Sequence, residues 1–292
     1  MRFTKMHGAG NDYIYVNCMD GTFGGDESSI LNDERRLAEI ARRISRPHFG
    51  IGADGMVLIM PSEVADVRMR MFNADGSEGK MCGNATRCIG KYVYDNGYIH
   101  REAITLETAS GIKYLTLYPG ADDKVEMVTV DMGAPELIAE KIPVILPEAG
   151  KDTDVPVSVE GEEMLINPVS MGNPHGVVFV DAVTDALVLG IGPKLEVHGM
   201  WPDRANIEFA HVLSDDTIEM RVWERGSGET LACGTGACAT AVAAMRTGRV
   251  GADEVTIRLI GGDLKVRWDR QQGGHVYMTG SATTVFEGEI NL

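Results

Sequence analysis

The sequence has little positive charge. Of its 292 residues, 27 are Lys or Arg and 43 are Asp or Glu, which gives a formal net charge of -16 at pH 7. Nucleic acids and anionic membrane surfaces are bound by basic patches, so neither is an expected partner. No apolar run approaches the ~20 residues of a membrane span, and the first segment, MRFTKMHGAGNDYIYVN, lacks the apolar core of a signal peptide. We therefore expect no membrane association.

Cysteine is scarce and follows no metal-binding or disulfide pattern. There are five, an odd number, at positions Cys18, Cys82, Cys88, Cys233 and Cys238. A disulfide framework is not expected, and a reducing cytoplasm is the predicted location. The spacings are not C-x-x-C and no paired-histidine motif is present, so no metal site is predicted. Cys18, Cys88 and Cys238 are expected to fill core space, as unpaired cysteines commonly do.

Some segments resemble known cofactor-binding or metal-binding motifs, but their sequence context argues against those functions. GIGADG at 50–55 matches G-x-G-x-x-G, but it follows an expected helix and enters an expected strand, the reverse of a dinucleotide fingerprint. NADG at 73–76 suggests a calcium loop, yet the register would put Met71 and Cys82 at ligand positions. The chain contains neither G-x-x-x-x-G-K nor G-x-S-x-G.

The length and patterning predict an α+β protein of two domains. One domain per roughly 150 residues gives two, and the polar segment YPGADDK suggests a boundary near 120–125. Residues 1–17 are interpreted as one strand, 32–44 as an amphipathic helix, and the acidic region up to about 205 as a loop. Further strands are expected at 55–60, 67–72, 103–108, 111–118, 124–132, 177–181, 207–213 and 217–223, with a hairpin over 253–268.

Two regions repeat the same pattern. Residues 71–117 align with 222–268 at a constant offset of 151, so that Cys82-Gly83 meets Cys233-Gly234. Each region predicts a strand, a glycine-rich loop, a buried helix that ends at a glycine (Gly97 and Gly248), and a hairpin. Upstream, GNDYIYVN resembles GNPHGVVFVD. The chain is therefore expected to be two similar halves, which commonly enclose a ligand cleft.

This repeat predicts a chemistry as well as a fold. A cysteine at a helix N-terminus has its pKa lowered from ~8.5 to roughly 3.5–7.5, and the N–H groups there bind a carboxylate. If the two helix starts face one another, Cys82 and Cys233 lie on opposite faces of one substrate α-carbon. One thiolate then removes the α-proton while the other thiol protonates the opposite face. The sequence thus predicts a two-base racemase or epimerase.

At these residues the sequence resembles the diaminopimelate epimerase family. The similar stretches span nearly the whole chain: KMHGAGNDY, HFGIGADG, FNADGSE, MCGNATRC, SMGNPH, ERGSGETLACGTGACA and YMTG. The resemblance implies two domains, 1–124 with 280–292 and 125–279, each a mixed β-barrel around a central helix, with the active site between them. It implies interconversion of LL- and meso-2,6-diaminopimelate for lysine and peptidoglycan synthesis, without a cofactor, by a homodimer.

The resemblance also implies roles for individual residues. Cys82 and Cys233 are the acid/base thiols, and His175 and Glu224 adjust their pKa values. Backbone N–H groups at the two helix starts hold the reacting carboxylate, namely those of Gly83, Asn84, Gly234 and Thr235. Asn11 faces the reacting amino group. The distal end of the substrate is contacted by Asn73, Asn173, Asn206, Glu224 and Arg225.

One position departs from the family pattern, and other interpretations remain open. Some members have a glutamine that contacts the substrate amine where this chain has Gly55. A proline racemase or hydroxyproline epimerase would share the thiols but need no distal charged pocket, whereas phenazine-biosynthesis isomerases lack the cysteine pair. A reversible Cys82–Cys233 redox switch and an inactive amino-acid-binding protein are the alternatives from other classes.

Overall fold

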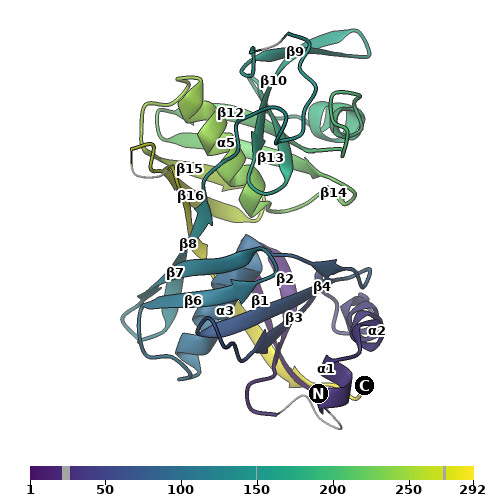
Figure 1. Ribbon diagram of the computed structural model, residues 1–292, viewed down its shortest axis with the longest axis vertical. Coiled ribbons are helices and arrows are strands. Elements are labelled where there is room, and N and C mark those ends of the chain that lie inside the picture. Colours follow the sequence, from purple (N-terminus) through teal and green to yellow (C-terminus); the bar gives the residue numbers. More distant parts are fainter. Residues whose placement is uncertain (22–26, 149, 272–273) are drawn as a thin grey trace. The chain divides into compact units, whose positions relative to one another are not determined.

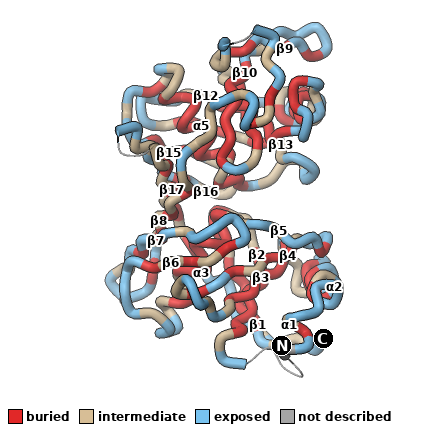
Figure 2. Tube along the Cα trace, in the orientation of Figure 1, coloured by how far each residue is buried: buried red, intermediate tan, exposed pale blue. Residues whose placement is uncertain are grey.

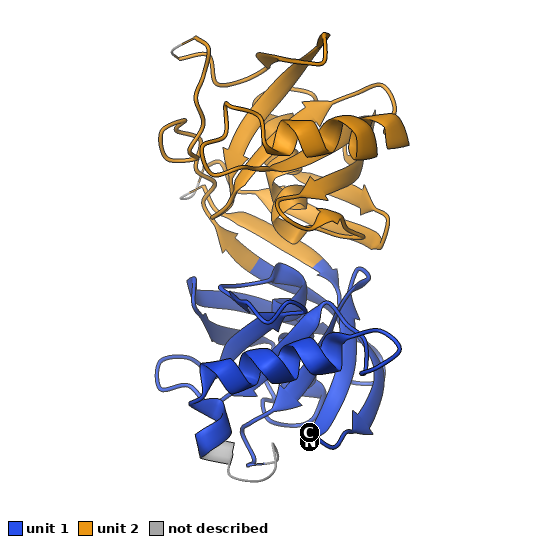
Figure 3. Ribbon diagram, turned by 90° about the vertical axis from the view of Figure 1, so that its right-hand side faces the viewer, with its two compact units in different colours: residues 1–130, 280–292 blue, residues 131–279 orange. Residues whose placement is uncertain are grey.

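The chain folds into two compact units. The computed structural model describes residues 1–21, 27–148, 150–271 and 274–292, and no predicted site residue falls outside them. Unit 1 comprises residues 1–130 and 280–292, and unit 2 comprises residues 131–279 (Figure 3). The segment YPGADDK forms the turn between two paired strands, β7 (Gly111–Pro119) and β8 (Val125–Gly133), and the division between the units falls after Val130, within β8.

Unit 1 is a mixed sheet around one helix. The sheet follows the path β18–β1–β2–β3–β4–β6–β7–β8, in which β2–β3 and β4–β6 are parallel and the other neighbours antiparallel. Helix α3 (Gly83–Asp95) packs on β1, β2 and β7 (Figure 1). The other elements are α1 (Glu27–Leu31), α2 (Glu34–Ser45), β1 (Arg2–Gly8), β2 (Asn11–Asn17), β3 (Gly55–Met60), β4 (Val67–Asn73), β5 (Glu78–Gly79), β6 (Ala103–Thr108), β7 (Gly111–Pro119), β8 (Val125–Gly133) and β18 (Thr283–Glu289).

Unit 2 repeats this arrangement. Its sheet follows the path β9–β10–β11–β12–β13–β15–β16–β17, with β11–β12 and β13–β15 parallel. Helix α5 (Gly234–Arg246) packs on β10, β11, β12 and β16. The other elements are β9 (Val155–Val159), β10 (Glu162–Ser170), β11 (Pro174–Phe179), the π-helix η1 (Ala186–Ile191), α4 (Gly192–Glu196), β12 (Asn206–Ser214), β13 (Thr217–Glu224), β14 (Gly228–Glu229), β15 (Glu254–Leu259), β16 (Gly262–Trp268) and β17 (Val276–Ser281).

The predicted repeat is confirmed at the predicted offset. Helices α3 and α5 begin at Gly83 and Gly234, and the strands that follow them begin at Ala103 and Glu254, all 151 residues apart. Both helices end as expected, because the glycines after their C-caps have positive φ values, 75° at Gly97 and 69° at Gly248. The two units therefore present their helix starts in the same structural context.

Small side chains let the central helices pack closely against their sheets. A Cβ at Gly90 of α3 would lie 2.8 Å from Leu117 Cδ2 and 3.1 Å from Leu115 Cδ2, so glycine permits close contact with β7. In α5, only Thr235 and Arg246 are not buried, and most of the rest are Gly, Ala or Cys (Figure 2). Tyr92 of α3, expected to be buried, is half-buried and stacks on Tyr98 with ring centroids 6.2 Å apart.

The amphipathic helix near residue 32 is confirmed as α2. Asp33 is its N-cap, and the side chain accepts a hydrogen bond of 3.1 Å from Arg36 N. The helix buries Leu37, Ile40, Ala41 and Ile44 on one face. This apolar stripe, placed on the unit 1 sheet, is what stabilises a helix that is otherwise strongly charged.

Two predictions of local structure were wrong. Residues 1–17 form two antiparallel strands, because Ala9 and Gly10 adopt positive φ values of 52° and 79° and reverse the chain. The acidic region before residue 205 is not all loop, since it contains η1 and α4, which bury Val188 and Leu195. Among the described residues, no helix has the length and apolar character needed to cross a membrane.

Candidate active site

Strand register places the predicted site residues at equivalent positions in the two units. The row Ile14–Met56–Phe72 of unit 1 corresponds to the row Gly176–Ile207–Trp223 of unit 2, because β2–β3–β4 and β11–β12–β13 pair in the same way. Counting from these rows gives five matched pairs: Asn11 and Asn173, Tyr13 and His175, Gly55 and Asn206, Asn73 and Glu224, and Cys82 and Cys233. The predicted residues thus belong to one repeated framework.

In unit 1 the Cys82 thiol forms a hydrogen bond with Asn11. Cys82 is the N-cap of α3 and half-buried, and its Sγ donates to Asn11 Oδ1 over 3.3 Å. Asn84 Nδ2 donates to the same oxygen over 3.2 Å, and Asn11 Nδ2 donates to Asp54 Oδ2 over 2.6 Å. Asp54 therefore fixes the Asn11 amide with its oxygen toward the thiol. The sequence analysis missed Asp54, although it lies within the HFGIGADG stretch.

A buried cation lies behind this start of α3. Arg87 is fully buried, and its guanidinium donates to Asn84 Oδ1 over 2.8 Å and to Ser281 O over 3.1 Å. A buried guanidinium requires such acceptors. It holds Asn84, one of the residues predicted to bind the substrate carboxylate, and it adds positive charge where an anion is expected. The CGNATRC motif contains Arg87, but nothing in the sequence marks it as buried.

Tyr13 and Gly55 shape the same corner of unit 1. Burial raises the pKa of the Tyr13 phenol well above its ordinary value, and negative charge on Cys82 and Asp54 adds to the effect, so the phenol stays neutral. A Cβ at Gly55 would lie 2.1 Å from Phe72 O and 2.9 Å from the Tyr13 ring. The backbone here therefore leaves no room for the glutamine that some members have at this position.

In unit 2 the thiol is more deeply buried. Cys233 is the N-cap of α5 and only 6% exposed. Its Sγ accepts a hydrogen bond of 3.3 Å from Gly236 N and lies 3.5 Å from Thr235 Oγ1. Burial raises the thiol pKa well above its ordinary value, the carboxylates of Glu224 and Glu208 raise it further, and the two hydrogen bonds oppose them. The simple expectation that a helix start lowers this pKa is therefore wrong for Cys233, because desolvation outweighs the helix effect.

His175 lies in a buried hydrogen-bonded chain. Its ring is fully buried, with Nδ1 2.7 Å from Glu208 Oε1 and Nε2 3.0 Å from Asn173 Oδ1. The two residues predicted for different tasks, Asn173 and His175, are therefore in direct contact. Glu208 was not predicted. Its signal is a charged residue inside the stretch IEFA of the strand, which is otherwise apolar.

The remaining predicted residues of unit 2 meet at one loop. Asn206 Oδ1 accepts from Arg225 N over 3.0 Å, and Asn206 Nδ2 donates to Pro174 O over 3.0 Å. Glu224 Oε1 accepts from Thr230 Oγ1 over 2.5 Å. The Arg225 guanidinium is exposed and donates to Asp203 O over 3.0 Å. The loop after β13 thus carries a carboxylate and a guanidinium side by side.

A buried carboxylate anchors this loop from behind. Glu196 is 4% exposed, and its Oε1 accepts from Gly226 N over 2.7 Å and from Arg204 over 2.6 Å. Its Oε2 accepts from Trp223 Nε1 over 3.0 Å. These hydrogen bonds join Glu196 to Gly226 in the turn after β13, to Trp223 near the end of β13, and to Arg204 before β12. Glu196 follows the π-helix in the region that was expected to be a loop, so the sequence analysis missed it.

The equivalent corner of unit 1 is held differently. Asn73 Nδ2 donates to Ser77 Oγ over 2.9 Å, and Asn73 N donates to Ser77 O over 2.8 Å. Ser77 Oγ in turn donates to Asp75 Oδ1 over 2.6 Å. The NADGS stretch therefore forms a closed turn that places the Asn73 amide at the end of β4. Its acidic residue, Asp75, is hydrogen-bonded within the turn.

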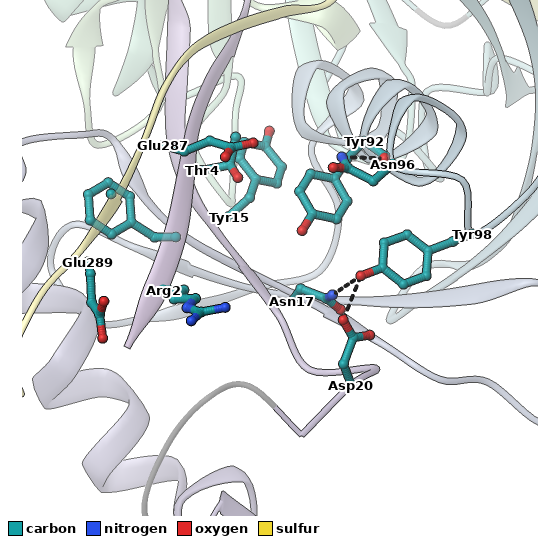
Figure 4. Close-up of a pocket in the computed structure, with 12 residues that line it drawn as sticks. Arg2, Thr4, Tyr15, Asn17, Asp20, Tyr92, Asn96, Tyr98, Glu287 and Glu289 are labelled. Atoms are coloured by element: carbon teal, nitrogen blue, oxygen red, sulfur yellow. Dashed lines mark hydrogen bonds between the residues drawn. The ribbon is translucent and has the colours of Figure 1, made fainter.

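One cavity of unit 1 lies apart from these residues. It has a volume of about 530 Å³ and lies between β1, β2, β18 and the end of α3. Asn17 donates to Tyr98 Oη over 2.7 Å, and Tyr98 donates to Asp20 over 2.6 Å (Figure 4). Burial and Asp20 raise the pKa of Tyr98 to about 12. None of the predicted residues lines this cavity.

No metal or disulfide chemistry is evident in the described part of the chain. No group of three His, Cys, Asp or Glu side chains among those residues could hold a metal ion. All five cysteines are free thiols. The groups available for chemistry at the two helix starts are therefore thiols, amides, one imidazole and carboxylates.

Solved structures of similar fold include a racemase, an epimerase and a phenazine biosynthesis protein. A probable proline racemase from Agrobacterium radiobacter superposes with a TM-score of 0.68 at 17% identity, covering 100% of this chain and 93% of that protein. A hydroxyproline epimerase from Agrobacterium vitis gives 0.68 at 18% identity, covering 99% and 90%. A phenazine biosynthesis protein from Bacillus anthracis gives 0.66 at 16%, covering 100% and 99%. These likenesses confirm the predicted α+β fold of two similar units.

Sequence relatives define the family more narrowly. The sequence model described as Diaminopimelate epimerase matches residues 3–138 and 168–285. Proteins named diaminopimelate epimerase from Acetivibrio thermocellus and Desulfovibrio desulfuricans are each 52% identical, covering 100% of this chain and 99% of the relative. One from Methanococcus maripaludis is 49% identical over the full length of both chains. The chain belongs to the diaminopimelate epimerase family, and it is an isomerase.

Proposed function

We propose that the protein interconverts LL- and meso-2,6-diaminopimelate through two cysteines and supplies lysine and peptidoglycan synthesis. The observation that carries the mechanism is the equivalence of Cys82 and Cys233, each the N-cap of the central helix of its unit. The substrate is taken from the names of relatives about 50% identical to this chain. One thiol on each of two matched helix starts is what epimerisation at a single carbon requires.

The reaction needs one thiolate and one thiol at a time. The thiolate removes the α-proton of the reacting centre, and the negative charge that develops is spread into the carboxylate. The opposite thiol then donates its proton to the other face of the carbon, which inverts its configuration. Each turnover leaves the two cysteines in exchanged protonation states, and the reverse reaction uses them in the opposite order.

Backbone dipoles do much of the stabilisation in this proposal. The N–H groups of Gly83, Asn84, Gly234 and Thr235 belong to the first turns of α3 and α5, where no intrahelical acceptor is available. Aimed at the substrate carboxylate, they hold it and favour the charge that develops on it in the transition state. Asn11, already fixed by Asp54, lies beside Cys82 to receive the reacting amino group.

The distal end of the substrate carries a second amino and carboxyl group. Glu224 would take the ammonium, and Arg225 can bind the carboxylate with two parallel hydrogen bonds. The amides of Asn73, Asn173 and Asn206 complete this set. A polar pocket that demands both charged groups discriminates strongly against substrates that lack them, because its own polar groups would otherwise stay unpaired.

The remaining parts of the proposal concern assembly and location. The proposed mechanism uses residues of both units, with one thiol from each. The reaction as proposed uses no cofactor, because thiols and backbone dipoles supply its acid, base and charge stabilisation. The family resemblance favours a homodimer, and the five free thiols favour a reducing cytoplasm.

The test is α-proton exchange in D₂O. The reduced protein is incubated with LL-diaminopimelate, and the α-proton is followed by NMR. We expect deuterium at one α-carbon together with formation of the meso isomer, and loss of conversion in Cys82→Ala and in Cys233→Ala. Cys18→Ala is the matched control and should retain the activity, because Cys18 is a buried thiol outside the helix starts.

The other outcomes are equally informative. Exchange on proline or hydroxyproline but not on diaminopimelate would preserve the mechanism and refute the substrate. Exchange that survives in both alanine variants would refute the two-thiol mechanism. Absence of exchange on all three compounds would favour a redox or binding role, which a titration of free thiols with and without reductant would then separate.

A further inference from the structure

Glu208 is a buried carboxylate that the proposed mechanism does not use. It lies near the start of β12 and is fully buried. Its Oε1 contacts His175 Nδ1 at 2.7 Å, and its Oε2 has no hydrogen-bond partner within the described residues. Burying a carboxylate with one oxygen unpaired costs several kcal/mol. Such a cost calls for a reason beyond packing.

The fold itself does not require a charge at this position. Glu208 pairs with Val222 across β12–β13, and the equivalent pair across β3–β4 in unit 1 is Val57 and Met71. The same framework is therefore built with a buried valine at Val57. His175 likewise has the neutral Tyr13 as its counterpart. Unit 2 thus carries a carboxylate and an imidazole behind its thiol where unit 1 carries an aliphatic side chain and a phenol.

Gly236 allows the carboxylate to approach the thiol. A Cβ at Gly236 would lie 2.7 Å from Glu208 Oε1 and 3.2 Å from Cys233 Sγ. Both atoms therefore flank one point in the first turn of α5, and they are within about 6 Å of each other by geometry. Any larger residue at 236 would separate them. The structure thus brings a fully buried carboxylate next to the Cys233 thiol.

We propose that Glu208 is a positioning residue for Cys233: it orients His175 behind the first turn of α5 and places a negative charge beside the thiol, so that Cys233 holds its proton in the resting protein. This inference rests on the acid/base role proposed above for Cys233. The charged groups near the thiol are Glu224 from β13, Glu208 from β12 and, when protonated, His175 from β11.

The proposal requires one orientation of the groups around His175. Asn173 Oδ1 faces Nε2 as the side chain is placed, and a neutral ring whose Nδ1–H donates to Glu208 Oε1 requires the Asn173 amide to be turned so that its nitrogen donates to Nε2. The charge of Glu208 is then not cancelled, and it acts on Cys233 across a region that excludes water. A second thiolate is disfavoured there, which keeps one thiol available as the proton donor.

Alkylation of Cys233 tests this without any substrate. Only the thiolate reacts with iodoacetamide, so the rate at each cysteine, measured by peptide mass spectrometry, follows its thiolate fraction. At pH 8 we expect Glu208→Gln to raise the Cys233 rate about tenfold, the effect of lowering a thiol pKa by one unit. Glu208→Val introduces the residue found at the equivalent position of unit 1, Val57, and should also raise the Cys233 rate. The Cys82 rate should not change.

Controls separate charge from packing. Glu219→Gln makes the same chemical change at an exposed position of β13 and should leave the Cys233 rate unaltered. In the unmodified protein, Cys233 alkylation should reach half of its maximal rate at a higher pH than the alkylation of a free cysteine peptide. This profile tests whether Cys233 holds its proton, and the two Glu208 variants test whether Glu208 is a cause; either folded variant is sufficient.

Two results would overturn the inference. One is a Cys233 rate unchanged or lowered in a folded Glu208→Gln protein, and the other is half-maximal alkylation of the unmodified protein below pH 8. Epimerisation supplies a separate readout, in which Glu208→Gln should lower kcat and leave KM nearly unchanged, since the substrate contacts remain. If the unmodified protein fails to turn over diaminopimelate, the proposed function fails while the alkylation results still decide the role of Glu208.

Discussion

Replacing Glu196 by glutamine should loosen the loop that carries Glu224 and Arg225. The Glu196 carboxylate accepts hydrogen bonds from Gly226 N, from Arg204 and from Trp223 Nε1, so it joins both sides of the turn after β13. Glutamine keeps the shape but has one acceptor oxygen and one amide nitrogen. One of the present donors must then face another donor.

The structure sets the size of this effect. A buried donor left unpaired costs about 1–3 kcal/mol, and the bonds that remain lose the strength that the charge gave them. The Arg204 pair is discounted, because that side chain is 50% exposed and screened by solvent. We expect the free energy of unfolding to fall by about 2–4 kcal/mol, a large share of the ~5–15 kcal/mol typical of a domain.

Urea unfolding and steady-state kinetics together measure the change. Beyond the stability loss, KM for diaminopimelate should rise about tenfold, equivalent to ~1.4 kcal/mol, because the loop no longer holds its charged groups in place. Glu219→Gln is again the matched control. A Glu196→Gln protein with unchanged stability and unchanged KM would refute the view that this carboxylate anchors the distal pocket.

Two further substitutions probe close contacts at glycines. Gly236→Ala would favour the helix by ~1 kcal/mol, but its Cβ would lie 2.7 Å from Glu208 Oε1. We expect the free energy of unfolding, measured with urea, to fall by about 1–2 kcal/mol and epimerisation to be slower. Gly55→Gln would place a Cβ 2.1 Å from the backbone oxygen of Phe72. We expect the free energy of unfolding, measured by thermal denaturation, to fall by about 3 kcal/mol, and substrate affinity not to increase.

If either variant were as stable as the unmodified protein, the expected steric clash at that glycine would be refuted. Gly190→Ala serves as the control for both, because a Cβ there meets nothing within 4 Å. A Gly55→Gln variant that folds normally and lowers KM would mean that the strand pair β3–β4 can shift to admit the side chain found in other members.

The framework of the site could be predicted because its signals are local. Cysteine followed by glycine before a run of small residues marks each helix start, and the glycines at 97 and 248 mark where the helices end. The offset of 151 then fixes two equivalent halves. The thiols, the amides at the helix starts and the loop after β13 all follow from these patterns or from the family resemblance.

The supporting residues could not be predicted in the same way. Asp54, Glu196 and Glu208 are acidic residues in a chain with 43 of them, and sequence does not distinguish a buried carboxylate from a solvated one. Their roles arise from contacts between segments far apart, such as Glu196 with Gly226. The raised pKa of Cys233 likewise depends on burial, which offsets the helix effect that the sequence suggested.

The equivalence of Val57 and Glu208 has a consequence for how such a protein can arise. Two identical copies of one half would carry a carboxylate behind both thiols or behind neither, so both thiols would favour the same protonation state. A single polypeptide with two halves escapes that symmetry, because each half can change its sequence independently. Covalent duplication followed by divergence therefore allows the resting protein to keep a proton on one thiol while the other is free to lose its own.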